Sequence, residues 1–172
     1  FTGVRTVVQE RGIGRVELSA ALPYPVVRAL LETLPGIEIE CRQGGIDDAV
    51  NVLRMIKDSG ELDLLRRACG ITDALIAEVP DFLARRSEAS ELELAMYLET
   101  EARSRGAEGM GFDTIAASSR RSFAIHCFPN FTSESIAVQG LSILDFGVRY
   151  EGYTSDVTLT LVRAPLTSKQ EA

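Results

Sequence analysis

The chain reads Ile143-Leu-Asp-Phe-Gly-Val-Arg-Tyr150, then Glu151-Gly152, then Tyr153-Thr-Ser-Asp-Val-Thr-Leu-Thr160, and this stretch decides its fold. Two strand-like runs flank a two-residue turn, which is the pattern of an antiparallel β-hairpin. The turn fixes the register of such a hairpin, and the register decides to which face each side chain belongs.

The register pairs Gly147 with Asp156 and Asp145 with Thr158. Because successive side chains alternate between the two sides of a strand, the hairpin separates into two faces. The apolar face has Leu144, Phe146, Val148, Tyr150, Tyr153, Val157, Leu159 and Leu161. The polar face, called the acid face below, has Asp145, Gly147, Arg149, Thr154, Asp156, Thr158 and Thr160.

Asp145 and Asp156 are diagonal neighbours on the acid face, a relation that places Cα atoms roughly 7 to 8 Å apart. Gly147 puts no side chain between them, and Thr158 can hydrogen-bond a carboxylate from outside the ligand shell. The geometry suits a divalent or dinuclear metal site. It equally suits the solvated face of an ordinary amphipathic hairpin, and the pattern alone leaves both interpretations open.

Length and composition limit the classes of protein to which this chain can belong. The 172 residues are 45% hydrophobic, which predicts a soluble globular chain of one domain with part of another. No apolar segment approaches the roughly 20 residues needed to cross a bilayer, and we expect no targeting signal.

The net charge of −7 argues against nucleic acid as the main partner. Three scattered cysteines indicate neither a disulfide framework nor a zinc-thiolate cluster, so we expect a cytoplasmic protein.

The N-terminal part predicts a β-α-β fragment followed by a linking helix. The predicted elements are a strand at Arg15 to Leu18, a helix at Pro25 to Leu34, a strand at Ile37 to Cys41 and a helix at Ile46 to Ile56.

Two long helices are predicted to follow. Asp58 with Glu61 forms a capping box for a helix from Ser59 to about Val79, and Pro80 is expected to kink or re-initiate it. Ser90 with Glu93 opens a second helix, Glu91 to Arg105. The glutamates of these helices, among them Glu91, Glu93 and Glu99, are expected to form solvated faces.

A strand at Thr114 to Ala117 and a polar loop at 118–122 are predicted before the only histidine, His126. A lone histidine is most often a hydrogen-bonded structural residue. Adjacent residues of an extended segment point opposite ways, so His126 and Cys127 are not expected to form a nucleophilic pair. Phe123, Phe128 and Phe131 could wall a pocket or pack in the core.

A set of short motifs spans residues 54 to 162. They are Arg54-Met-Ile-Lys57, Glu61, Ala68, Gly106-Ala-Glu-Gly109, Phe112-Asp113, His126, Leu144-Asp-Phe-Gly147 and Gly152-Tyr-Thr-Ser-Asp156-Val-Thr158. Their order resembles the M24-type pita-bread metallopeptidases, and most of all the proline-specific branch with Xaa-Pro dipeptidase and aminopeptidase P. Asp-Phe-Gly also occurs in kinases, but no Gly-rich phosphate loop or kinase catalytic loop accompanies it.

The resemblance implies an α+β pita-bread catalytic domain. We expect residues 1–43 to be the last part of an α/β N-terminal creatinase-like domain and residues 44–57 to form a linking helix. Residues 58–172 are expected to form the first half of the pita-bread peptidase domain. It implies that Asp145 and Asp156 bind metal, with Thr158 behind them. His126 would line the active site without binding metal, where it helps to bind substrate or to stabilise the tetrahedral intermediate.

The resemblance also implies two divalent ions, Mn²⁺, Co²⁺ or Zn²⁺, bridged by a hydroxide that attacks dipeptides or short peptides, with X-Pro bonds the leading expectation. A downstream glutamate would shuttle the proton. The full-length protein is expected to be a homodimer.

The chain departs from the family in two ways. Leu159 stands where an arginine is usual, at a position on the apolar face. A histidine and two glutamates that complete such a site come from the half of the domain after the hairpin, which is missing here. Ser168 with Glu171 forms another capping box just before the sequence stops. We therefore expect a truncated chain whose 172 residues alone are inactive.

Two alternatives stay open. The first is a non-catalytic pita-bread module that binds proteins, which would have lost part of the downstream ligand set. The second is a metal-free member such as a creatinase-like amidinohydrolase, and the presence of both Asp145 and Asp156 counts against it. Fold alone does not decide function.

Overall fold

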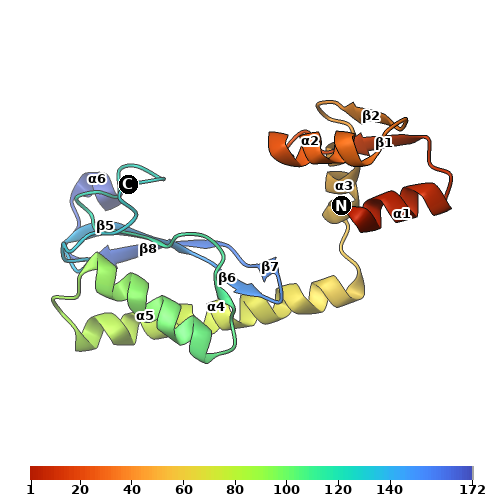
Figure 1. Cartoon of the computed structure of the whole chain (residues 1–172). Helices are drawn as coiled ribbons and strands as arrows, with labels where there is room; N and C mark the ends of the chain where they lie inside the picture. Colours follow the sequence, from red (N-terminus) through yellow and green to blue (C-terminus); the bar gives the residue numbers. More distant parts are fainter. Residues whose placement is uncertain (172) are drawn as a thin grey trace. The chain divides into compact units, whose positions relative to one another are not determined.

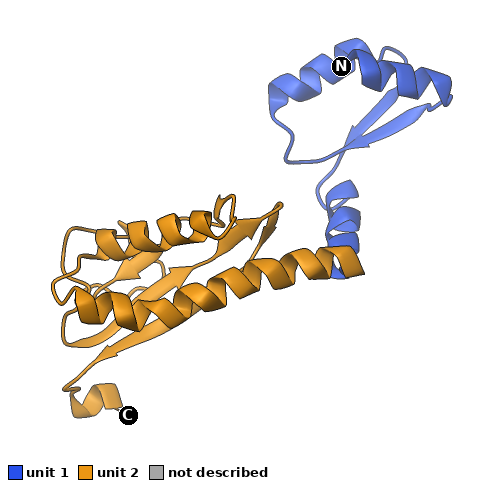
Figure 2. Ribbon diagram, turned by 90° about the horizontal axis from the view of Figure 1, so that it is seen from below, with its two compact units in different colours: residues 1–57 blue, residues 58–172 orange. Residues whose placement is uncertain are grey.

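The computed structural model describes residues 1–171 and divides into two compact units, Phe1–Lys57 and Asp58–Ala172 (Figure 2). Within the described residues, no helix is both long enough and apolar enough to cross a membrane.

The first unit is built around two parallel strands. Its elements are α1 (Thr2–Glu10), β1 (Arg15–Leu18), α2 (Tyr24–Thr33), β2 (Glu38–Cys41) and α3 (Ile46–Met55). β1 and β2 pair in parallel, with Val16 opposite Ile39, and α2 connects them. The β-α-β fragment and the helix after it are as predicted, whereas α1 was not predicted.

The second unit begins with two helices that cover one face of its strands (Figure 1). Both helices, α4 (Ser59–Arg85) and α5 (Glu91–Ser104), start with the predicted capping boxes, in which the N-cap and N3 residues exchange side-chain and backbone hydrogen bonds. The box residues are Asp58 with Glu61 and Ser90 with Glu93.

α4 does not end at Val79, and the expectation that Pro80 re-initiates it was wrong. The helix is continuous through Pro80 to Arg85. Val79 and Phe82 on either side of the proline are both buried in the core. Their burial offsets the one backbone hydrogen bond that the proline removes.

The strands of the second unit form two three-stranded sheets. They are β3 (Gly109–Met110), β4 (Ile115–Ala117), β5 (Gly140–Phe146), β6 (Val148–Tyr150), β7 (Tyr153–Thr154) and β8 (Val157–Arg163). One sheet has the order β3-β6-β7 and the other β4-β5-β8, with every pairing antiparallel. The hairpin therefore belongs to both sheets, and the chain passes from one sheet to the other at Gly147 and again at Ser155 and Asp156.

The core lies between the helices and the apolar face of the hairpin. Its most deeply buried large side chains include Leu75, Leu94, Leu98, Leu144, Phe146 and Val148. Leu159 packs against this cluster, as expected from its position on the apolar face of the hairpin. Burial of this apolar set keeps the hairpin in register, because a slip of one residue would expose it and bury the aspartates.

The last helix, α6 (Ser168–Glu171), is capped differently from the prediction. Thr167, and not Ser168, exchanges hydrogen bonds with the residue three positions on: its backbone N–H donates to Gln170 Oε1 at 2.9 Å, and its hydroxyl lies 3.0 Å from the same oxygen. The N–H of Gln170 donates to the backbone carbonyl of Thr167 at 2.8 Å and not to its hydroxyl, so the pair makes one half of a capping box.

Candidate metal centre

The hairpin has the register expected from its turn. Asp145 pairs with Thr158 in the β5–β8 ladder, and Arg149 pairs with Thr154 in the β6–β7 ladder, so Gly147 falls opposite Asp156 between them. Asp145 and Asp156 therefore belong to the same face, diagonal to each other. Asp156 is exposed and Asp145 is half-buried.

Thr158 holds the Asp145 carboxylate. Its hydroxyl donates to Asp145 Oδ1 at 2.9 Å, from the position directly across the ladder. This contact leaves the second carboxylate oxygen, Oδ2, without a hydrogen-bond partner among the residues described. A carboxylate fixed in this way by an outer partner is oriented for one ligand direction.

Glycine is required at position 147 because another backbone segment occupies the space of a side chain. A Cβ built there would lie 1.8 Å from the carbonyl oxygen of Ser155 and 3.1 Å from Cε1 of Phe112. Neither the carbonyl oxygen nor its peptide can be displaced without breaking the hairpin. The space beside Gly147 is therefore taken by the Ser155 carbonyl and closed to a side chain.

The two carboxylates fit part of a divalent metal site by their chemistry, since oxygen donors on one face suit such ions. They do not complete one. Among residues 1–171, no three or more His, Cys, Asp or Glu side chains come together in a way that could hold an ion.

His126 lies in the long connection between β4 and β5, and Figure 1 shows part of this connection on the side of the strands away from α4 and α5. Its neighbour Cys127 is buried against Ile115 and Ala117 of β4. Ile115 pairs with Asp145, so Cys127 anchors the segment on the acid side of the sheet. His126 itself is exposed whereas Cys127 is buried, and the segment there is a turn and not the extended strand on which the sequence argument relied.

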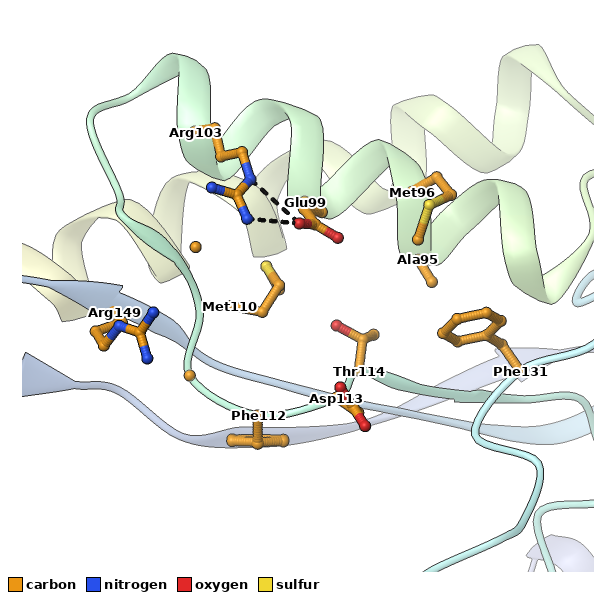
Figure 3. A pocket seen from close by; sticks show the side chains of 12 residues that line it. Ala95, Met96, Glu99, Arg103, Met110, Phe112, Asp113, Thr114, Phe131 and Arg149 are labelled. Carbon is orange, nitrogen blue, oxygen red and sulfur yellow. Dashed lines mark hydrogen bonds and ion pairs between the residues drawn. The ribbon is translucent and has the colours of Figure 1, made fainter.

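The aromatic residues near His126 divide between two environments. Phe123 and Phe128 are among the most exposed large hydrophobic residues described, at 89% and 92%. Phe131 instead packs against the core and lines a groove of about 390 Å³ between α5 and the β3–β4 connection. Figure 3 shows the Glu99–Arg103 ion pair, 2.8 Å long, on the helix side of this groove. Arg149 of the acid face lines it, but neither Asp145 nor Asp156 does.

Glu91 corrects the expectation that the helix glutamates are solvated. Its side chain is 0% exposed, although it carries a carboxylate. One carboxylate oxygen accepts from the backbone N–H of Ser118 at 2.7 Å, and the other accepts from the backbone N–H and hydroxyl of Thr132, both at 2.8 Å. Arg121 forms an ion pair with the same carboxylate.

Glu91 thus joins the two ends of the segment that carries His126. Arg121 extends the network, because its guanidinium also donates to the carbonyl of Pro129 and lies 3.1 Å from Cys127 Sγ. The sequence does contain a signal for Glu91. The buried stripe of α5 is Glu91, Leu94, Ala95, Leu98 and Ala102. This helical spacing places the glutamate on the core face.

Residues 63–172 match the sequence profile of metallopeptidase family M24. The Xaa-Pro dipeptidase of Pyrococcus horikoshii is 30% identical over 165 residues, which are 93% of this chain and 43% of that protein.

Two solved structures are similar to the whole chain. The Xaa-Pro dipeptidase from Bacillus anthracis has a TM-score of 0.85 at 32% identity, with coverage of 98% of this chain and 45% of the other. The prolidase from Pyrococcus horikoshii has a TM-score of 0.80 at 28% identity, with coverage of 99% and 47%.

The chain therefore spans less than half the length of these relatives. Its fold class, an α+β pita-bread arrangement present in part, is the one expected from the motifs. From its sequence profile, its relatives and its fold, the chain belongs to metallopeptidase family M24.

Proposed function

We propose that this chain supplies the first two metal ligands, Asp145 and Asp156, of a peptidase that hydrolyses dipeptides or short peptides, with X-Pro bonds as its preferred substrates. The observation that carries the proposal is the shared face of the two carboxylates, with Gly147 between them and Thr158 bonded to Asp145. The substrate preference is supported by relatives that are named Xaa-Pro dipeptidase and prolidase.

When bound, divalent ions such as Mn²⁺, Co²⁺ or Zn²⁺ supply Lewis acidity and lower the pKa of water in the site. The residues of this chain bind the ions and orient the ligand groups. Asp145 and Asp156 provide charged oxygen donors, and Thr158 fixes the direction of one of them. In this proposal His126 hydrogen-bonds the substrate or the oxyanion that forms from its carbonyl. In the same proposal, a histidine and two glutamates beyond these two aspartates complete the site, as the resemblance to the family implies.

A cytoplasmic location and a homodimeric full-length protein are part of the same proposal. The described cysteines, Cys41, Cys69 and Cys127, are all free thiols, which is consistent with a reducing compartment.

Hydrolysis assays on the full-length gene product test the function. We expect it to cleave a dipeptide such as Ala-Pro, to lose this activity with a chelator, and to regain it with added Mn²⁺, Co²⁺ or Zn²⁺. Ala-Ala, which lacks the proline, is the control substrate that tests the preference for X-Pro bonds. A metal-replete protein that cleaves neither dipeptide nor longer X-Pro peptides would contradict the proposal and favour a protein-binding module.

His126→Ala is expected to lower kcat/KM for the X-Pro substrate by about 10²- to 10⁴-fold, the range for a side chain that acts directly on the reacting group. Metal content should stay at the wild-type level, because His126 is not a ligand. Elemental analysis beside the kinetic assay separates the two effects. Loss of stoichiometric metal in this variant would show that His126 is a metal ligand, contrary to the role proposed for it.

A further inference from the structure

We propose that Thr72 and Ser155 form a latch that sets the direction of Asp156 relative to Asp145, and that both act as positioning residues for the metal ligands. This inference rests on the proposed function of the two aspartates. Thr72 lies on α4, Ser155 immediately precedes Asp156, and the two are 83 positions apart in the sequence.

The latch is a chain of hydrogen bonds from the hairpin backbone to the helix backbone. The N–H of Val148 donates to Ser155 Oγ at 3.0 Å, Ser155 Oγ lies 2.6 Å from Thr72 Oγ1, and Thr72 Oγ1 donates to the carbonyl of Ala68 at 3.1 Å. Either hydroxyl can donate in the bond between them, and Ser155 Oγ also lies 3.4 Å from the carbonyl oxygen of Val148.

The Ser155 side chain takes the place of its own backbone carbonyl. In a regular antiparallel pair, residues 148 and 155 would exchange two backbone hydrogen bonds. Here only one is formed, from the N–H of Ser155 to the carbonyl of Val148 at 3.0 Å, and the N–H of Val148 donates to Ser155 Oγ instead.

The Ser155 carbonyl is consequently turned out of the ladder. Its oxygen lies where the Cβ of residue 147 would project, which is on the acid face between the aspartates. The peptide that joins Ser155 to Asp156 is rotated with it. The backbone direction from which the Asp156 side chain projects is therefore set by the hydroxyl of Ser155.

Removal of that hydroxyl has a specific consequence. The N–H of Val148 is buried, with its residue 0% exposed, so it must find another acceptor. The nearest one in a regular ladder is the Ser155 carbonyl itself. Its return to the ladder would rotate the Ser155–Asp156 peptide and turn Asp156 away from the direction that it shares with Asp145.

Burial of the pair points to a positioning role and away from simple packing. Thr72 and Ser155 are 4% and 5% exposed. A buried hydroxyl pair adds little net stability over apolar residues of the same shape, whereas satisfied polar networks specify a unique geometry. The geometry specified here is that of the residue next to Asp156.

The test measures metal binding by the full-length gene product, by titration of the metal-free protein with Mn²⁺ alone. Ser155→Ala is expected to weaken Mn²⁺ binding by about 10- to 100-fold, the range for partners that orient a metal ligand. Thr72→Val removes only the far hydroxyl and should weaken binding in the same direction by less. Thr72→Ser, which keeps the hydroxyl, should restore wild-type binding.

Ser142→Ala is the matched control. Ser142 is a buried serine on the same side of β5 as the core, with a single 3.4 Å hydrogen bond to the carbonyl of Ile136 and no contact with the latch. It should leave the Mn²⁺ Kd unchanged. Urea unfolding of each metal-free variant accompanies the titration, so that a loss of stability is separated from a loss of affinity.

The outcomes distinguish the latch from the function on which it rests. Wild-type Mn²⁺ affinity in Ser155→Ala and Thr72→Val, together with loss of binding in Asp156→Ala, overturns the latch and leaves the proposed function intact. Equal weakening of Mn²⁺ binding in Ser142→Ala also overturns the latch, since the loss of any buried serine would then have the same effect. A wild-type protein that binds no divalent ion overturns both.

Discussion

Asp145→Ala or Asp156→Ala is expected to abolish metal-dependent peptide hydrolysis by the full-length gene product. The loss in kcat/KM should exceed about 100-fold, the upper end for removal of a mere outer partner of a metal ligand. Each change removes a charged oxygen donor from the acid face while the apolar face, which holds the hairpin in register, is untouched. Peptidase assays with added metal measure the effect.

The folded state should be little affected by either change, because both side chains reach solvent and neither packs in the core. Circular dichroism and thermal unfolding of the metal-free variants check this point. Asp63→Ala provides the control, since Asp63 is an exposed acid on α4 with only a surface ion pair to Arg66. Wild-type turnover in either hairpin variant would falsify the ligand assignment.

Glu91→Ala is expected to destabilise the protein by about 3–5 kcal/mol, the cost of removing one partner from a buried ion pair. Arg121, only 16% exposed, would keep its charge without a counter-ion, and two backbone N–H groups, of Ser118 and Thr132, would lose their acceptor. Urea unfolding followed by circular dichroism measures the change in the free energy of unfolding.

Two further variants test the reason for this effect. Glu99→Gln breaks an exposed ion pair on the same helix and should cost less than about 1 kcal/mol. Changing Glu91 to leucine and Arg121 to methionine together should destabilise less than the sum of the two single changes, because no unpaired charge remains. Additive effects, or a change below 1 kcal/mol in Glu91→Ala, would mean that the buried pair is not what holds the segment.

Local patterns were sufficient for much of the second unit. The two capping boxes that open α4 and α5 involve residues three apart, and a hairpin register follows from a two-residue turn. Both were correct because every interaction that decides them lies within a few positions of the chain. The prediction for α6 was wrong for the same reason: Thr167 bonds to Gln170 in place of Ser168 to Glu171, and nothing in the sequence ranks these two overlapping local patterns.

Other features depend on contacts between distant segments. Pro80 favours the end of a helix, yet α4 continues because Val79 and Phe82 are buried in a core that α5 and the hairpin complete, with Phe82 stacked on Tyr97. Glu91 looks like one of several helix glutamates until the loop from Ser118 to Thr132 closes over it.

The sequence by itself determined that Asp145 and Asp156 share a face of one hairpin, because side-chain alternation and a tight turn are properties of neighbouring residues. It also determined the family, through motifs quoted from the same stretch. Only the tertiary structure decided that Ser155 bonds to Thr72 beneath that face, and which groups Glu91 binds in the segment that carries His126. Helical spacing can place Glu91 on the core face of α5, but the partners of these hydrogen bonds are 27 to 83 positions away and are set only when packing brings the segments together.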